Sequence, residues 1–259
     1  IGLGDGFIAW PGAATDGRLL LAKEVGSNMV EYCEWSPATK AVTPLFGQGE
    51  REDYEAVYGA ADGGIPRALA GRDLALGPYP VASQFSRAVF ETDADAYVLT
   101  IQPDVATCLF RHRQDGFPLM AYDNETWPER DRQWLRDEFE PVGLLDVDAS
   151  MENLAAIAGR LAARSGAPVL VYNVSSIVPG DTVYCYAGMD ETLATRIRRF
   201  NVALSDLSQR TGISIVDVDA VIARAGADRL KLDVFHLNDE GCRLVATEAV
   251  RVLDDLVNL

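Results

Sequence analysis

The segment Asp233-Val-Phe-His-Leu-Asn-Asp-Glu-Gly241 carries the residue types and the spacing that acid–base chemistry needs. An aspartate three residues before a histidine lets both side chains converge within one loop turn. The Asp233 carboxylate can then accept the proton on one imidazole nitrogen of His236. That contact fixes the tautomer and leaves the other nitrogen as a general base. The alternative interpretation is a surface loop. In that loop, Asp233 and Asn238 would serve only as caps for backbone N–H groups, and His236 would have no chemical role.

Histidine is scarce in this chain of 259 residues, which has only His112 and His236. Any mechanism that needs an imidazole must use one of them. His112 follows a predicted strand and could line a cleft, but we favour a solvated loop position for it. The chemical question therefore centres on His236.

The charge balance limits the classes of partner. The chain has 23 basic and 39 acidic residues and a net charge of −16, which excludes nucleic acid as an expected partner because phosphate backbones bind basic patches. No apolar run reaches the ~18 residues of a membrane span. Residues 1–12 lack the basic start of a signal peptide. We expect a cytoplasmic protein, with an upstream leader and the oligomeric state left open.

The four cysteines, Cys33, Cys108, Cys185 and Cys242, are widely spaced. They form no Cys-x-x-Cys pair and no cluster with histidine, which argues against a structural zinc site. A domain of this size does not need disulfides, so we favour reduced thiols, although two disulfides remain compatible with the sequence.

Strands and helices are predicted to alternate from residue 93 to the C-terminus. The expected elements are a strand at 93–101, a helix capped by Asp148 or Ser150, a strand at 168–172, a helix over 193–211, a strand at 213–218, a short helix at 220–225 and a last helix over 239–256 capped by Asn238. The stretch 111–141 is expected to be loop and short helix. This alternation predicts parallel βαβ units in a doubly wound α/β sheet.

The first third of the chain is less regular. Tyr32–Trp35 and Ala41–Phe46, joined by a proline-containing turn, predict a β-hairpin added to the parallel sheet. Arg18–Val25 is compatible with either a helix or a strand. We expect these segments to belong to one domain over residues 1–259.

The pattern Asp-x-x-His-Leu-Asn-x-x-Gly before a final amphipathic helix, with the element order of residues 93–256, resembles the closing block of the SGNH/GDSL hydrolase family. The resemblance implies a flavodoxin-like three-layer α/β/α sandwich with a parallel sheet. It implies an esterase, acyl hydrolase or O-acyltransferase acting on an ester-linked acyl group of a carbohydrate, a lipid or a small metabolite. In that family, His236 would be the general base and Asp233 its orienting carboxylate, with no metal or redox cofactor.

The nucleophile departs from the family pattern. The family has Gly-Asp-Ser near its start, whereas this chain has Gly4-Asp-Gly6, and a glycine cannot attack a carbonyl. Ser27 in Gly26-Ser-Asn28 is the second candidate and could attack an acyl carbon once His236 takes its proton, although this tripeptide also forms plain turns. Other serines such as Ser83 or Ser86 remain open. A chain with no nucleophile would instead be a ligand- or partner-binding protein of the same fold.

The expected oxyanion donor also departs from the pattern. The family's third block is Gly-x-Asn-Asp, and the corresponding segment here is Ile101-Gln-Pro-Asp104. Gln102 has the same amide group on a longer arm and could replace the asparagine. The alternative is that Gln102 only bonds local backbone. Loss of one oxyanion donor typically costs ~10²–10³ in rate, so the difference matters for activity.

Overall fold

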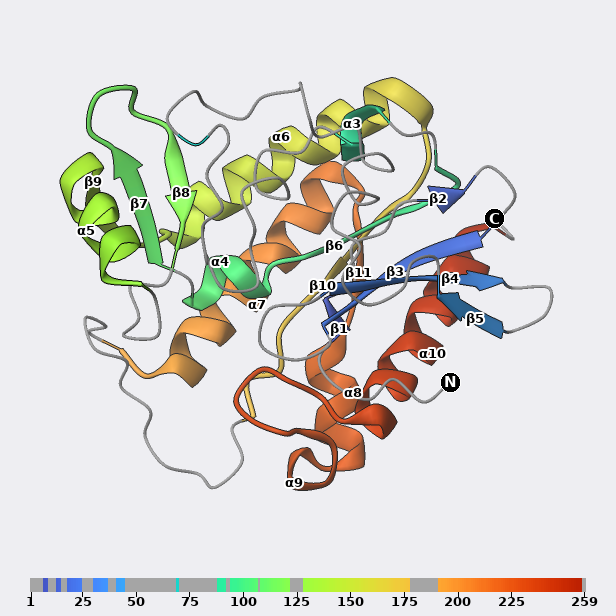
Figure 1. Cartoon of the computed structure of the whole chain (residues 1–259). Helices are drawn as coiled ribbons and strands as arrows, with labels where there is room; N and C mark the ends of the chain where they lie inside the picture. The colour runs from blue at the N-terminus through green and yellow to red at the C-terminus, as the bar shows by residue number, and fades with distance from the viewer. Residues whose placement is uncertain are drawn as a thin grey trace.

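A computed structural model of the chain describes most of the residues after 93 and several short segments before it (Figure 1). The described residues are 7–8, 13–14, 18–24, 30–36, 41–44, 69, 88–91, 94–106, 108–121, 128–177 and 191–257.

A parallel sheet of three strands lies at the centre of the described part. β6 (Tyr97–Thr100), β10 (Val169–Tyr172) and β11 (Ser214–Val216) pair in the order β11-β10-β6. Val171 of β10 is opposite Leu99 on one side and opposite Ile215 on the other. Because the strands are parallel, their carboxyl ends and the loops that follow them meet at one edge of the sheet.

Helices cover both faces of this sheet. α6 (Val147–Ser165) and α7 (Leu193–Thr211) pack on one face, and α8 (Val218–Ala225) and α10 (Asp239–Val257) pack on the other (Figure 1). The predicted three-layer α/β/α fold is therefore confirmed. No helix in the described part combines the length and the apolar character needed to cross a membrane.

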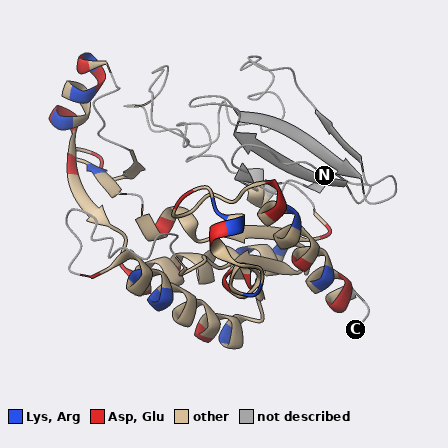
Figure 2. Ribbon diagram, turned by 90° about the horizontal axis from the view of Figure 1, so that it is seen from below, with Lys and Arg blue, Asp and Glu red and all other residues tan. Residues whose placement is uncertain are grey.

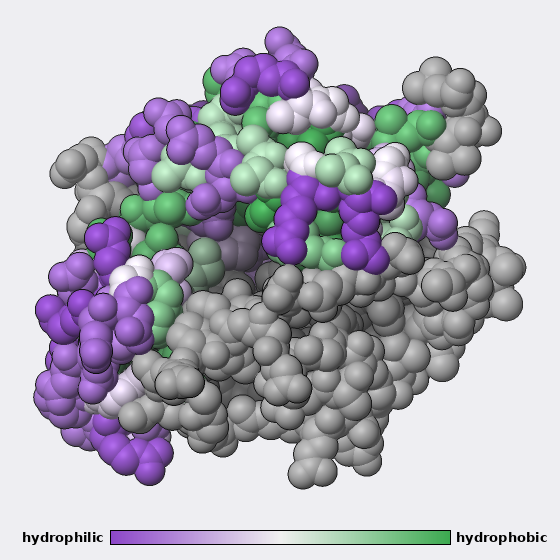
Figure 3. All heavy atoms as spheres, turned by 90° about the horizontal axis from the view of Figure 1, so that it is seen from above, coloured by the Kyte–Doolittle hydropathy of each residue, from purple (hydrophilic) through white to green (hydrophobic). Residues whose placement is uncertain are grey.

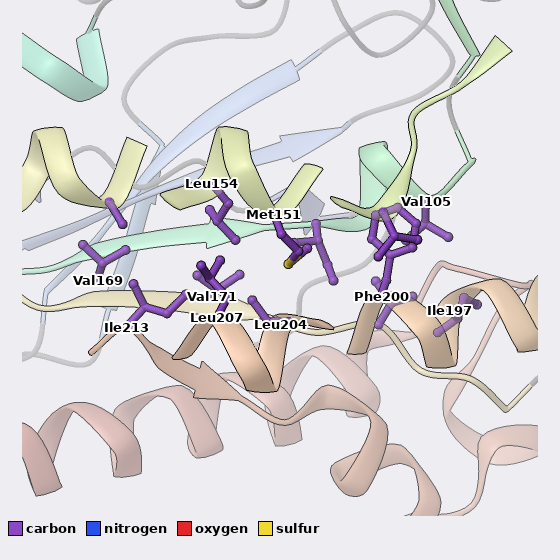
Figure 4. Packing of buried hydrophobic residues seen from close by; sticks show 14 of the residues in the cluster. Val105, Met151, Leu154, Val169, Val171, Ile197, Phe200, Leu204, Leu207 and Ile213 are labelled. Atoms are coloured by element: carbon purple, nitrogen blue, oxygen red, sulfur yellow. The ribbon is translucent and has the colours of Figure 1, made fainter. Parts of the chain in front are cut away.

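Alternate residues of β10 supply the two cores. Val169 and Val171 face Leu204 and Leu207 of α7 (Figure 4), while Leu170 belongs to the cluster on the opposite face. Residues of a strand alternate between faces, and a strand buried on both faces must be apolar throughout. The continuous apolar sequence of this strand follows from its central position.

The start of α6 corrects a predicted cap. The Asp146 carboxylate accepts the backbone N–H of Asp148 at 2.8 Å and is the N-cap, so neither predicted residue has that role. The Ser150 hydroxyl instead donates to Asp104 at 2.6 Å, across to the segment that follows β6. Burial raises the pKa of Asp104, and the Ser150 hydrogen bond and the nearby Arg196 charge oppose that rise.

An antiparallel sheet lies at one end of the molecule. β7 (Cys108–His112) pairs with β8 (Pro118–Met120) and β9 (Phe139–Leu144), and α5 (Glu129–Glu138) precedes β9 (Figure 1). Hydrophilic residues gather over this end of the molecule (Figure 3). The prediction of loop and short helix for 111–141 missed these strands, because each is short and their side chains share one small apolar cluster that includes Phe110, Leu119 and Phe139.

His112 lies inside this antiparallel unit and is only 3% exposed. Its ring stacks on Phe117 with the centroids 4.7 Å apart and meets the edge of Phe139 at 5.0 Å. Its Nδ1 accepts the backbone N–H of Asp115 at 3.1 Å. The expectation of a solvated loop histidine is wrong, since the side chain points into the small core of the unit.

The N-terminal strands form a separate antiparallel sheet. β3 (Arg18–Glu24) pairs with β4 (Val30–Ser36), which pairs with β5 (Ala41–Pro44). β1 (Phe7–Ile8) and β2 (Ala13–Ala14) both pair with β3. The predicted hairpin is confirmed as β4–β5, and the ambiguous segment at 18–25 is a strand.

Three short helices complete the described elements. α3 (Ala88–Glu91) precedes β6, α4 (Gln102–Ala106) follows it, and α9 (Ala227–Leu230) precedes α10. Pro103 lies in the first turn of α4, where a missing backbone N–H costs no helical hydrogen bond. α9 lies between the helices predicted at 220–225 and 239–256, where no helix or strand was predicted.

Two of the four cysteines have described side chains. Cys108 is an exposed free thiol, and the Sγ of Cys242 lies 3.7 Å from the carbonyl oxygen of Leu237. The expectation of reduced thiols stays a prediction. Cys33 lies in β4, and Cys185 lies outside the described residues.

A buried arginine joins α7 to the segments beside it. Arg196 is 7% exposed, and its guanidinium donates to the carbonyl oxygens of Val105 at 2.7 Å, Asp104 at 3.4 Å and Leu145. These carbonyls come from α4 and from the loop between β9 and α6.

Elsewhere, acidic and basic residues are interspersed along the described helices (Figure 2).

We expect Arg196→Met to lower the free energy of unfolding by about 3 kcal/mol, because partly buried carbonyls would lose their donor. The matched control is Arg199→Met on the exposed side of the same helix, where the guanidinium pairs with Glu191 at 2.7 Å. That change should cost less than about 1 kcal/mol. Urea denaturation measures both, and equal losses would contradict the structural role of Arg196.

Candidate active site

The loop between α9 and α10 carries Asp233 and His236 and is closed at its base by two backbone hydrogen bonds. The N–H of Leu232 donates to the carbonyl of His236, and the N–H of Asn238 donates to the carbonyl of Leu230, both at 2.8 Å. The loop is therefore a small closed turn whose ends are fixed next to each other.

Asp233 and His236 are brought together within this loop. The Nδ1 of His236 lies 2.6 Å from Oδ2 of Asp233, while Oδ1 of Asp233 accepts the N–H groups of Phe235 and His236 at 2.8 Å each. Partial burial acts to raise the pKa of Asp233, but these hydrogen bonds outweigh it and hold that pKa below its usual value. An ionised Asp233 keeps the imidazole proton on Nδ1, which makes Nε2 the free basic nitrogen. The His236 side chain is 44% exposed, so it is open to a ligand.

A buried lysine lies directly before this pair. Lys231 is 7% exposed, and its Nζ donates to the carbonyl of Ile177 at 2.7 Å. Burial lowers the pKa of Lys231 to about 8, against the opposing charges of Asp233 and Asp219. The loop is thus attached to the segment that follows β10.

The segment after β10 is itself bound to the start of α8. The Asp219 carboxylate accepts the backbone N–H of Ser176 at 2.7 Å and its hydroxyl at 3.2 Å. The Asn173 side chain accepts the N–H of Asp219 at 3.1 Å and donates to Asp217 at 2.8 Å. These polar groups at the carboxyl edge bond to one another. Within the described residues, no group of three His, Cys, Asp or Glu side chains could hold a metal ion.

Gly241 is required by the close approach of α10 to the end of α9. A Cβ at this position would lie 2.8 Å from the carbonyl oxygen of Leu230. The side chain of Asn238 accepts the N–H of Gly241 at 3.0 Å, as a helix cap does, and donates to the carbonyl of Arg229 at 2.6 Å. The predicted cap at Asn238 is therefore confirmed, and the glycine in Asp-x-x-His-Leu-Asn-x-x-Gly has a steric reason.

Gln102 begins α4 directly beyond the carboxyl end of β6. Its backbone N–H donates to the Thr100 hydroxyl at 3.2 Å. This is the same edge of the sheet to which Lys231 attaches the His236 loop. The role of the Gln102 amide as an oxyanion donor remains a prediction.

Ser27, Ser83 and Ser86 lie outside the described residues, as does Gly6. Ser176 lies within them, but it is buried and its hydroxyl is bonded to Asp219. Ser176 therefore acts in holding the edge of the sheet together.

Lys231 and Asp219 are the residues of this region that sequence reasoning missed. A signal for Lys231 was present, because the chain has three lysines in all and Lys231 lies two residues before Asp233. Asp219 carried no comparable signal, since it is 14 residues from Asp233 in a different element.

Solved structures to which the chain is similar include the following two. One is a member of the lipolytic protein G-D-S-L family from Veillonella parvula DSM 2008, with 18% identity, a TM-score of 0.32, and coverage of 41% of this chain and 54% of that one. The other is phospholipase A1 from Streptomyces albidoflavus NA297, with 17% identity, a TM-score of 0.29, and coverage of 42% and 55%. The chain spans just over half the length of each of these two solved structures. No protein-family model and no curated protein matches the chain.

We expect Gly241→Ala to lower the free energy of unfolding by about 1–3 kcal/mol, because the added methyl group must displace the Leu230 carbonyl that closes the loop. Gly159→Ala in α6 is the control, since nothing lies within 4 Å of a Cβ there. It should raise stability by about 0.5–1 kcal/mol through helix propensity. Denaturant melts of both variants test the contrast, and a gain from both changes would refute the close approach.

Proposed function

We propose that this chain is an ester hydrolase or acyltransferase in which His236 is the general base and Asp233 orients it. The observation that carries the proposal is the 2.6 Å contact between His236 Nδ1 and Asp233 Oδ2. The carboxylate is itself held by two backbone N–H groups, so the imidazole has a fixed direction and a free Nε2. A general base of this kind typically accelerates a reaction by about 10²–10⁴-fold.

In the proposed reaction, Ser27 gives its proton to His236 Nε2 as its Oγ bonds to the acyl carbon of the ester. The Gln102 amide donates to the negative oxygen that forms. His236 then returns the proton to the leaving alcohol, and an acyl-serine remains. Water completes hydrolysis, whereas a hydroxyl of a second molecule completes transfer. A carbohydrate ester or another small-molecule ester is the proposed substrate, and one domain over residues 1–259 is the proposed unit.

A binding protein of the same fold is the second candidate. Gly6 stands where the family pattern has its serine, which favours a chain that has kept the Asp233–His236 pair without a nucleophile. Such a protein would hold a ligand or a partner at the same edge of the sheet.

We expect His236→Ala to lower hydrolysis of a short-chain aryl ester by at least roughly 10²-fold, because the serine loses its base. The side chain is exposed, so the variant should fold as the wild type does. Asp239→Asn, an exposed change three residues further along the chain, is the control and should retain the wild-type rate. An unchanged rate in His236→Ala would refute the proposed role.

A fluorophosphonate probe separates the candidates. Covalent labelling of the wild type, lost in Ser27→Ala, supports the serine mechanism. Turnover without labelling indicates attack by an activated water, and neither turnover nor labelling indicates the binding protein. Labelling that persists in Ser27→Ala would assign the nucleophile to another serine.

A further inference from the structure

The proposed reaction leaves unused the charged group that lies beneath the Asp233–His236 loop. Lys231 is buried, and a buried ammonium is costly unless hydrogen bonds and opposite charges compensate for it. Its Nζ has one hydrogen bond to a neutral acceptor, the carbonyl of Ile177 at 2.7 Å. The remaining compensation comes from charge.

Two carboxylates, Asp233 and Asp219, supply that compensation. Asp219 lies in the first turn of α8, where its carboxylate accepts the backbone N–H and the hydroxyl of Ser176. Asp233 belongs to the loop, where it holds His236. Burial lowers the pKa of Lys231 to about 8, and the charges of the two carboxylates act in the opposite direction without cancelling that effect. Near neutral pH the lysine is therefore mostly protonated and interacts with both acids.

We propose that Lys231 is a positioning residue for His236. Its hydrogen bond to Ile177 holds the loop against the carboxyl edge of β10, and its positive charge acts on Asp233, the carboxylate that contacts the imidazole. This inference rests on the proposed function. A general base must be unprotonated to accept a proton, and an uncompensated carboxylate beside the imidazole would favour the imidazolium form. The positive charge of Lys231 near Asp233 opposes that effect.

The coupling of Lys231 to Asp233 can be measured without any substrate. In protein labelled with ¹³C-lysine, only Lys23, Lys40 and Lys231 contribute lysine signals, and Lys231→Met assigns the third. We expect the Lys231 signal to titrate with a midpoint of about 8 in the wild type. Asp233→Asn should move the midpoint to lower pH by roughly half a unit or more, because a stabilising negative charge is removed.

The control for this measurement is Asp206→Asn, which removes the same charge from the exposed side of α7 and should leave the midpoint in place. Equal midpoints in the wild type and in Asp233→Asn would overturn the proposal. This result does not depend on whether the protein hydrolyses esters, so it is distinguishable from failure of the proposed function.

Activity provides the second measurement. In Lys231→Met, which keeps the aliphatic stem, the acid limb of the kcat/KM profile for an aryl ester should move to higher pH by roughly half a unit or more. Lost activity near neutral pH should then recover as the pH rises. A loss that is uniform across pH would indicate only a structural role and would overturn the proposal. If Lys231→Met does not fold, Lys231→Gln is measured in its place with the same expected direction.

Discussion

The described part of the fold depends on the burial of one strand, β10, between two partners and two layers of helix. A parallel ladder needs cover on both faces, because its connections place helices there and leave the strands no contact with water. Leu170 is wholly buried on one side of β10 and Val171 on the other. Neighbouring strands occupy both edges of β10, and helices cover both of its faces. Polar groups are therefore arranged beyond its carboxyl end.

The polar residues at that end form a continuous series of contacts. Asn173 and Ser176 are bonded to the start of α8, Ile177 is bonded to Lys231, and Lys231 begins the loop that holds Asp233 and His236. Elements far apart in the sequence are joined here through short side chains and one lysine. The exposed histidine is thereby supported by the most buried strand of the described fold.

The sequence predicted what depends on local spacing. The helix at 193–211, the strand at 168–172 and the Asp233–His236 contact all follow from residues a few positions apart, and the structure has each of them. The strands at 108–144 were missed because they are stabilised by packing around Phe139 rather than by their own pattern. The contacts of Lys231 were missed because its partner lies 54 residues away in the chain. Spacing along the chain does not reveal such a pair.

Gly241 of α10 lies close against the carbonyl of Leu230, which closes the base of the histidine loop, so the loop and the helix are in direct contact. α10 has 19 residues and is about 28 Å long. Val245 and Ala249 are buried in the cluster on its face of the sheet. The position of the histidine loop is therefore set by the packing of the whole helix as well as by the hydrogen bonds within the loop.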